Sequence, residues 1–177
     1  MALPVTFVAG DVLEAAQLNS NFSYLDAGGQ IASFTEYQAG GTNGGTATSG
    51  AWTKRTLNTT VLNTITGCTL TTSVIALPAG TYRIDASSSF VGVNSCSIKL
   101  RNTTDGTDTI LGTATFDGAG GVGGSPVPLS GAFTIAGTKN FEIQYRVATT
   151  RASDGLGAGA NFGVNECFTS VTIEKVA

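Results

Sequence analysis

The chain of 177 residues is long enough for one hydrophobic core but not for two large domains. Hydrophobic residues make up 41% and charged residues only 12%, which argues against disorder and implies an exterior built largely from Thr, Ser, Asn and Gly. The formal net charge is −3, and the nine Lys and Arg residues are scattered. The chain therefore lacks the basic stripe with which nucleic-acid-binding proteins displace counterions from phosphates.

The first residues predict neither secretion nor membrane insertion. The opening sequence MALPVTFVAG has no basic n-region and is followed at once by Asp11, unlike a secretion signal. No apolar run approaches the ~20 residues that a membrane-spanning helix requires. We therefore expect a protein that is made in the cytoplasm and leaves it, if at all, by a route such as lysis.

Residues 1–30 are predicted to form a separate N-terminal segment that contains a short helix. Asp11 is the expected N-cap with Glu14 as its reciprocal partner, and Gly28-Gly29 ends the helix. Apolar residues at steps of three and four form one stripe, which consists of Ala15, Leu18, Phe22 and Leu25. So short a helix is unstable alone in water. Its stripe needs a partner: the rest of the chain, copies of itself or another protein.

Residues 31–177 are predicted to form an all-β domain, because apolar residues now recur with a period of two. Glycine-rich loops, expected to be flexible, separate the strands at 39–45, 118–124 and 155–163. No helical pattern lies between consecutive strands, which disfavours nucleotide-binding α/β folds. About eight to ten short strands indicate an antiparallel sandwich or barrel; they are expected at 31–37, 51–61, 70–77, 81–93, 97–102, 109–116, 129–135, 141–147 and 166–176.

The three cysteines predict neither a disulfide framework nor a zinc site. Cys68, Cys96 and Cys167 are odd in number and widely spaced, and there is no histidine to join them. Cys96 and Cys167 each alternate with apolar residues of their strands. We therefore expect free thiols in the core.

The sequence offers little for catalysis. The absence of histidine removes Ser-His-Asp and Cys-His nucleophile systems. Asp105 and Asp108 lie in a Thr-Asp-Gly-Thr-Asp stretch that predicts a hairpin turn more simply than a calcium site. The glycine loops match no phosphate-binding motif. We expect no catalytic residue, no metal and no cofactor, and a pair of carboxylates that hydrolyses a glycosidic bond is the one catalytic alternative.

Several fragments resemble a module that recurs in tail-fibre and virion proteins of tailed phages. They are Thr42–Thr46, Thr48–Trp52, Arg55–Asn58, Leu77 with Ala79–Ile84, Ala148–Ala152 and Gly155–Gly163, in the order found in that family. The opening residues Val5–Leu13 with Ala16–Asn19 are also similar to the start of many phage fibre proteins, where this segment is associated with attachment to the particle. The resemblance implies a jelly-roll-like β-sandwich, similar to the heads of C1q and tumour necrosis factor, built as a homotrimer.

This resemblance defines the expected partners and sites. The partners are further copies of the chain, other virion proteins through residues 1–30, and a glycan or protein of the host surface. The stripe Ala15, Leu18, Phe22 and Leu25 is the expected site of oligomerisation and attachment. The expected display loops carry Asn43, Gly44, Asp117, Gly120, Asp154 and Gly157. Trp52, Tyr82 and Phe162 are either surface anchors or, more commonly for aromatic residues in a sandwich, core residues.

A tail-fibre head that binds the host surface is the preferred hypothesis. Only about 20 residues separate the predicted helix from the first strand that bears Trp52, so no long shaft lies between anchor and head. That short reach keeps a capsid-decoration protein open as an alternative. A virion polysaccharide depolymerase and a cellular lectin-like module are weaker alternatives.

Overall fold

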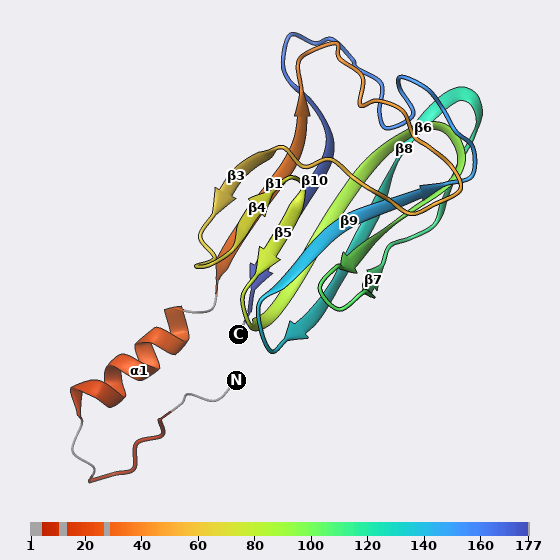
Figure 1. Cartoon of the computed structure of the whole chain (residues 1–177). Coiled ribbons are helices and arrows are strands. Elements are labelled where there is room, and N and C mark those ends of the chain that lie inside the picture. The colour runs from red at the N-terminus through yellow and green to blue at the C-terminus, as the bar shows by residue number, and fades with distance from the viewer. Residues whose placement is uncertain (1–4, 11–13, 27–28, 177) are drawn as a thin grey trace.

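The computed structural model describes residues 5–10, 14–26 and 29–176, with the side chains of 23–26, 117–123 and 125 outside this description. A helix, α1 (Ala15–Asp26), precedes one antiparallel sheet of ten strands (Figure 1). The strands are, in chain order, β1 (Gln30–Gln38), β2 (Thr53–Lys54), β3 (Thr59–Asn63), β4 (Thr69–Thr71), β5 (Val74–Leu77), β6 (Gly80–Asn102), β7 (Thr107–Leu111), β8 (Thr115–Ile135), β9 (Lys139–Val147) and β10 (Glu166–Lys175). The predicted all-β fold with a short N-terminal helix is confirmed.

The long strand β6 folds the sheet into a sandwich because it belongs to both layers. Its first half, residues 82–88, pairs with β10, whereas its second half, residues 96–102, pairs with β9. The first layer has the order β3-β1-β10-β6-β8, and the second contains β6, β9, β5 and β4 in sequence, with β2 beside β9 and β7 beside β6. The sequence predicts two separate strands for this region, but the backbone continues as one strand through Asn94 and Ser95, where its pairing with β8 shifts register.

Apolar side chains from both layers fill the space between them. Fully buried residues of the first layer include Phe34, Ile84 and Ile173, and those of the second include Ile98 and Ile143. Removing such a side chain from water contributes about 1.5–3 kcal/mol each. This alternation of buried and exposed positions is the pattern that the sequence predicts for strands of a sandwich.

The sequence predicts a loop for the glycine-rich stretch 118–124, but in the structure this stretch is part of β8. Its backbone pairs with β6 on both sides of a large irregularity: Val91 faces Gly124 and Val93 faces Ala119, so two steps along β6 oppose five along β8. Glycine has little strand propensity of its own, but pairing with a long neighbouring strand overrides that preference. The predicted display residues Asp117 and Gly120 therefore lie within a strand, and the side chain of Asp117 is outside the description.

A β-bulge between β1 and β10 turns the side chain of Cys167, a predicted core residue, toward solvent. Glu36 pairs with Thr169 and Tyr37 pairs with Cys167, so Phe168 is an extra residue on β10. Phe168 and Thr169 are consequently both buried, while Cys167 is exposed. The prediction of a buried thiol is wrong for Cys167, because its alternation with later residues of the strand is broken by the bulge. Cys68 and Cys96 are buried free thiols, as predicted.

A buried ion pair joins the two layers. The backbone N–H of Arg55 donates to the carbonyl oxygen of Ile143 on β9 at 2.8 Å, while its side chain crosses the core to Glu36 on β1 at 3.2 Å. The side chains are 0% and 1% exposed. Arg55 Nε donates to Thr169 Oγ1 at 2.6 Å, and Thr169 Oγ1 donates to Glu36 Oε2 at 3.1 Å. Charges withdrawn from water need such partners.

The same guanidinium reaches the loop that follows β9. Arg55 Nη2 donates to the carbonyl oxygens of Leu156 at 2.7 Å and Phe168 at 3.1 Å. Its carbon Cζ also lies 5.4 Å from the ring centroid of Phe90. Burial raises the pKa of Glu36 despite the opposing charge of Arg55. The ion pair therefore connects β1, β10 and the loop at 148–165 through one side chain.

Replacing Arg55 by Met should lower the free energy of unfolding by about 3–5 kcal/mol, because Glu36 would be left buried without its cation. The double variant Arg55→Met/Glu36→Gln should lose less than Arg55→Met alone. Denaturant unfolding of the purified protein measures both values.

The control is Arg83→Met, which removes an exposed pair with Glu174 at 3.7 Å whose side chains are 66% and 41% exposed. That change should cost no more than about 1 kcal/mol. Equal losses for Arg55→Met and Arg83→Met would show that the buried pair does not stabilise the fold.

Candidate functional site

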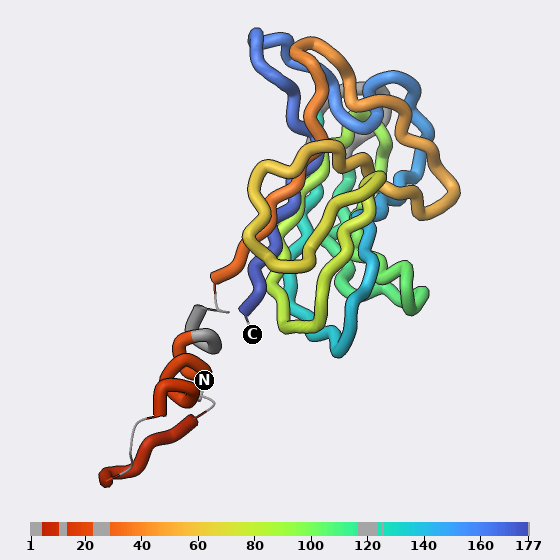
Figure 2. The backbone as a smooth tube through the Cα atoms, turned by 60° about the vertical axis from the view of Figure 1, so that its left-hand side comes forward, coloured from red at the N-terminus to blue at the C-terminus, as the bar shows by residue number. Residues whose placement is uncertain are grey.

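The molecule has two structurally distinct ends. Figures 1 and 2 show α1 lying beyond one end of the sandwich, the end at which β1 begins and the C-terminus lies. The loop at 39–52 and the loop at 148–165 both lie at the opposite end, where their tubes run side by side in both views. We call these two loops together the loop end. Candidate sites for attachment and for recognition are therefore separated by the length of the sandwich.

The helix leaves its apolar stripe open. Leu18 is 38% exposed, Phe22 is 58% exposed and Ala15 is also exposed. The side chain of Leu25 and the predicted N-cap Asp11 lie outside the description. Figures 1 and 2 place α1 outside the sandwich, so these described residues do not pack against the β domain. The stripe thus remains available to another chain.

One contact organises the segment before the helix. The buried side chain of Asn21 accepts a hydrogen bond from the backbone N–H of Val5 and donates one to its carbonyl oxygen, both at 3.0 Å. The helix starts later than predicted, at Ala15, with the carbonyl oxygen of Glu14 accepting the first bonds. No helix among the described residues is long and apolar enough to span a membrane.

Backbone hydrogen bonds hold the two loops together. The N–H of Gly44 donates to the carbonyl oxygen of Gly157 at 2.8 Å, and Leu156 donates to Gly45 at 3.0 Å. Ala47 and Arg151 exchange a reciprocal pair of bonds at 2.9 Å. The sequence predicts flexible loops here, but residues more than a hundred positions apart brace each other. The outcome is one ordered surface and not two free loops.

Two glycines allow this close approach. A Cβ on Gly44 would lie 2.6 Å from the carbonyl oxygen of Leu156. A Cβ on Gly157, whose φ is +134°, would overlap the ring of Phe168. Larger residues at either position would force the loops apart. Glycine is therefore required here for packing, and these predicted display residues serve the interior of the loop end.

Glu166, the first residue of β10, fastens the outer part of both loops. Its Oε1 accepts hydrogen bonds from the backbone N–H groups of Gly41 at 2.9 Å and Asn161 at 2.8 Å. These bonds lower the pKa of Glu166 because they favour its ionised form. Within the second loop, Arg151 binds Asp154 through two hydrogen bonds of 2.7 Å, which lower the pKa of Asp154.

The structure gives the predicted display residues mostly bracing roles. Asn43 is exposed, but its Oδ1 accepts the N–H of Gly159 at 2.9 Å. Gly44 and Asp154 are half-buried, and Gly157 is buried. The loop end instead exposes Phe162 and Val164, at 85% and 67%. Phe162 was one of three aromatic candidates in the sequence; Tyr82 lies in the core and Trp52 is half-buried. Val164 follows no pattern that could have identified it.

Cations bind the carboxylates of Asp105, in the turn between β6 and β7, and Asp108, near the start of β7. Asp105 Oδ1 lies 2.6 Å from Lys139 Nζ, and Asp108 Oδ1 lies 2.8 Å from both Lys99 Nζ and Arg101 Nη1. These contacts lower the pKa of each carboxyl. The stretch forms the turn that the sequence favours, with its oxygens directed to ammonium and guanidinium groups. Among the described residues no three His, Cys, Asp or Glu side chains gather to hold a metal ion.

Acidification should open the loop end through Glu166. Because its folded pKa lies below the ordinary value of 4.5, its ionised form stabilises the closed loops above that pH, and this contribution is lost as the pH falls through the lowered pKa. Hydrogen-exchange protection of the Gly41 and Asn161 amides should therefore fall as the pH is lowered from about 6 to below 4.5.

In Glu166→Gln the two amides should be less protected at neutral pH and insensitive to this pH change. Glu174→Gln, which alters a carboxyl of the same strand that pairs with Arg83, is the matched control and should behave as the wild type. Unchanged protection in Glu166→Gln would show that the carboxylate does not fasten the loops.

The comparisons with known proteins bear on the fold. No family model and no curated protein matches the sequence. The crystal structure of murine APRIL at pH 5.0 is similar with a TM-score of 0.55 and 10% identity, over 83% of this chain and 98% of that one. The globular domain of the zebrafish complement 1qA protein is similar with a TM-score of 0.53 and 11% identity, over 84% and 98%. At such identities the likeness shows the fold alone: the β domain is a jelly-roll-like sandwich.

Proposed function

We propose that the protein is a homotrimeric component of a tailed-phage virion, attached to the particle through residues 1–30 and displaying its β-sandwich as a tail-fibre head that binds the host surface. One observation carries this proposal: the open apolar stripe of α1 and the braced loop end lie at opposite ends of the sandwich. A protein with this polarity can be held at one end while the other meets a ligand. The resemblance of residues 42–163 to phage virion modules supplies the biological setting.

The loop end has the properties of a recognition surface. Its loops are positioned by a rigid sandwich and by each other, which reduces the conformational entropy lost on binding. Phe162 and Val164 present apolar side chains at high exposure. Exposed aromatic residues of this kind are common anchors in protein interfaces. We assign to these two residues the contact with a host receptor.

Exposed apolar residues elsewhere support association between copies of the chain. Besides Leu18 and Phe22 on α1, the edge strand β3 exposes Val61 and Leu62, at 54% and 46%. Val61 lies where the ladder between β1 and β3 shifts register. An uncovered apolar edge strand invites pairing with another chain, and natural proteins normally cover or charge it. A trimer would cover these residues.

Capsid decoration is the second candidate, and the length of α1 favours it. Twelve helical residues span only about 18 Å, so the sandwich would lie close to the surface that holds the N-terminal segment. A decoration protein needs no longer reach, whereas a tail fibre normally holds its head far from the particle. In both candidates the protein acts by binding and not by catalysis.

Replacing Leu18 and Phe22 together by Asp should abolish the trimer, because two charges would enter the packed stripe. Light scattering of the wild type should give about 54 kDa, three times 17.9 kDa, and the variant should give about 18 kDa. The far-UV circular dichroism of the sheet should not change, since α1 makes no part of the β core.

The control Asn19→Asp/Ser20→Asp adds the same charge at exposed polar positions of the helix and should remain trimeric. A wild-type mass near 18 kDa at micromolar concentration, on the particle-free protein, would contradict a preassembled trimer. Loss of the sheet signal in the Leu18/Phe22 variant would place the helix in the core.

The purified protein should block infection by the parent phage, because it competes for the host receptor. Phe162→Asp/Val164→Asp should lose this competition, whereas Asn165→Asp, an exposed neighbour in the same loop, should keep it. Binding to assembled shells without any competition at the host surface would favour decoration instead. New reducing ends released from host polysaccharide by the protein would contradict a function based on binding alone.

A further inference from the structure

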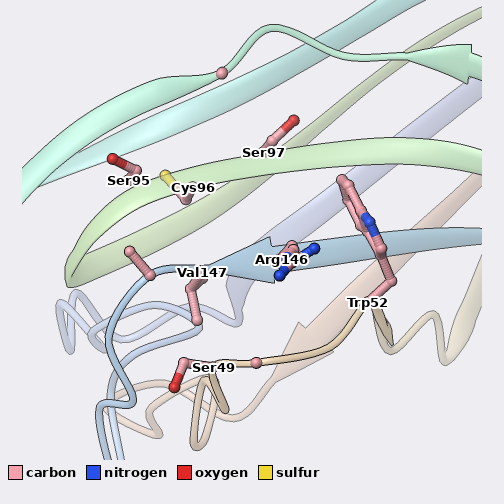
Figure 3. Close-up of a pocket in the computed structure, with 10 residues that line it drawn as sticks. Ser49, Trp52, Ser95, Cys96, Ser97, Arg146 and Val147 are labelled. Atoms are coloured by element: carbon pink, nitrogen blue, oxygen red, sulfur yellow. The ribbon is translucent and has the colours of Figure 1, made fainter.

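A groove of about 480 Å³ opens beside the loop end, and it combines an aromatic ring, a cation and hydroxyl groups. Figure 3 shows that its side chains come from β6, from β9 and from the loop that precedes β2. The volume lies in the range of pockets that hold small molecules. The lining consists of Ser49, Gly50, Trp52, Ser95, Cys96, Ser97, Ala114, Arg146, Val147 and Ala148.

Strand register brings the polar residues of the groove together. Ser97 on β6 pairs directly with Arg146 on β9, and Cys96 pairs with Val147. Alternation along both strands therefore turns Ser97 and Arg146 outward while Cys96 and Val147 are buried. Trp52 immediately precedes β2, whose Thr53 pairs with Tyr145 on β9. The ring of Trp52 thus stands at the Arg146 end of the groove, as Figure 3 shows.

The ring of Trp52 is held in place by a buried cation. Lys99 Nζ lies 4.3 Å from the ring centroid, and the same atom binds Asp108 at 2.8 Å. The side chain of Lys99 is only 6% exposed. A cation against the ring, itself fixed by an ion pair, limits the orientations that the indole can adopt. Trp52 is therefore a preorganised wall and not a mobile surface side chain.

Arg146 is an available cation. Seven of the nine Lys and Arg residues form ion pairs within the chain. Arg146 is exposed and forms no ion pair with any carboxylate whose side chain is described. In a chain with a net charge of −3, a guanidinium that lies in a groove and pairs with none of the described carboxylates is a site for an external anion.

Hydroxyl groups near Arg146 also lack strong internal partners. Ser95 is exposed, and its hydroxyl forms no hydrogen bond with the described residues. The hydroxyl of Ser97 reaches only the carbonyl oxygen of Ile98 at 3.5 Å, the limit for such a bond. Both can therefore exchange water for the hydroxyl groups of a ligand.

We propose that this groove binds an acidic saccharide, with the sugar ring against Trp52, its carboxylate on the guanidinium of Arg146 and its hydroxyl groups on Ser95 and Ser97. A planar guanidinium holds a carboxylate through two parallel hydrogen bonds, and an aromatic ring offers an apolar surface to the face of a sugar. A neutral sugar would leave Arg146 unpaired. This inference rests on the proposed host-surface function, for which it names the class of ligand.

The chain contains a single tryptophan, so Trp52 fluorescence reports the groove directly. Titration of the full-length protein at low salt with oligogalacturonate, and separately with sialyllactose, should give a saturable change with at least one of these two acidic probes. Arg146→Met should weaken that binding by at least about tenfold. Arg83→Met, which removes an exposed arginine on the other layer, should leave it unchanged. The methyl ester of the bound probe, which lacks the charge, should bind at least about tenfold more weakly.

The proposal is overturned if neither acidic probe saturates below about 10 mM, if Arg146→Met binds as the wild type does, or if the methyl ester binds equally well. Competition against infection separates this result from the proposed function. If the protein binds the probe but does not compete against infection, the groove is a saccharide site and the host-binding function is wrong. If the wild type and Arg146→Met compete equally well and neither probe binds, the host-binding function stands and the saccharide site in the groove is wrong.

Discussion

The buried guanidinium of Arg55 is the constraint on which the arrangement of this protein depends. Its backbone belongs to one layer of the sandwich through Ile143, and its side chain binds Glu36 and Thr169 in the other. Its remaining contacts reach Leu156, in the loop that must be placed accurately for the loop end to form. A buried ion pair adds little net stability compared with apolar packing, but every alternative register would leave a charge without its partner. The pair therefore selects one arrangement.

The β-bulge on β10 makes that arrangement possible. Because Phe168 is an extra residue, both Phe168 and Thr169 turn inward. Thr169 then joins Arg55 and Glu36, while Phe168 packs where Gly157 leaves room. Burial raises the pKa of Glu36, so the folded chain takes up this proton at a higher pH than the unfolded chain, and by linkage that uptake does not lower the stability of the fold. Acid sensitivity comes instead from the carboxylates that fasten loops and turns and whose pKa is lowered by those contacts, Glu166 among them.

Local patterns in the sequence were sufficient for the elements and insufficient for their pairing. Period-two alternation located most strands, and the apolar stripe located α1, because both depend on residues close together in the chain. The bulge that exposes Cys167 and the pairing of residues 118–124 depend on a partner strand, which local patterns do not contain. No local pattern predicted the contact between Arg55 and Glu36, since a charged residue in or beside a strand normally faces water. The loop end was predicted to be flexible because its bracing bonds link residues more than a hundred positions apart.

The proposed attachment and recognition sites are built from different kinds of residue. The candidate attachment site is an apolar stripe that remains open in the single chain, and the candidate recognition site consists of loops that brace each other through hydrogen bonds within the chain. Among the side chains that the loop end exposes are the apolar ones of Phe162 and Val164, and the groove with Trp52 and Arg146 lies beside them. Such a surface suits binding of a defined ligand by a head that changes shape little.

Electron cryomicroscopy of the intact particle tests the central claim most directly, because it shows both where the protein is bound and which end faces outward. The account predicts a threefold density in which α1 contacts the particle and the loop at 148–165 points into solvent. Density in which the loop end is buried against the particle while α1 is free would contradict it.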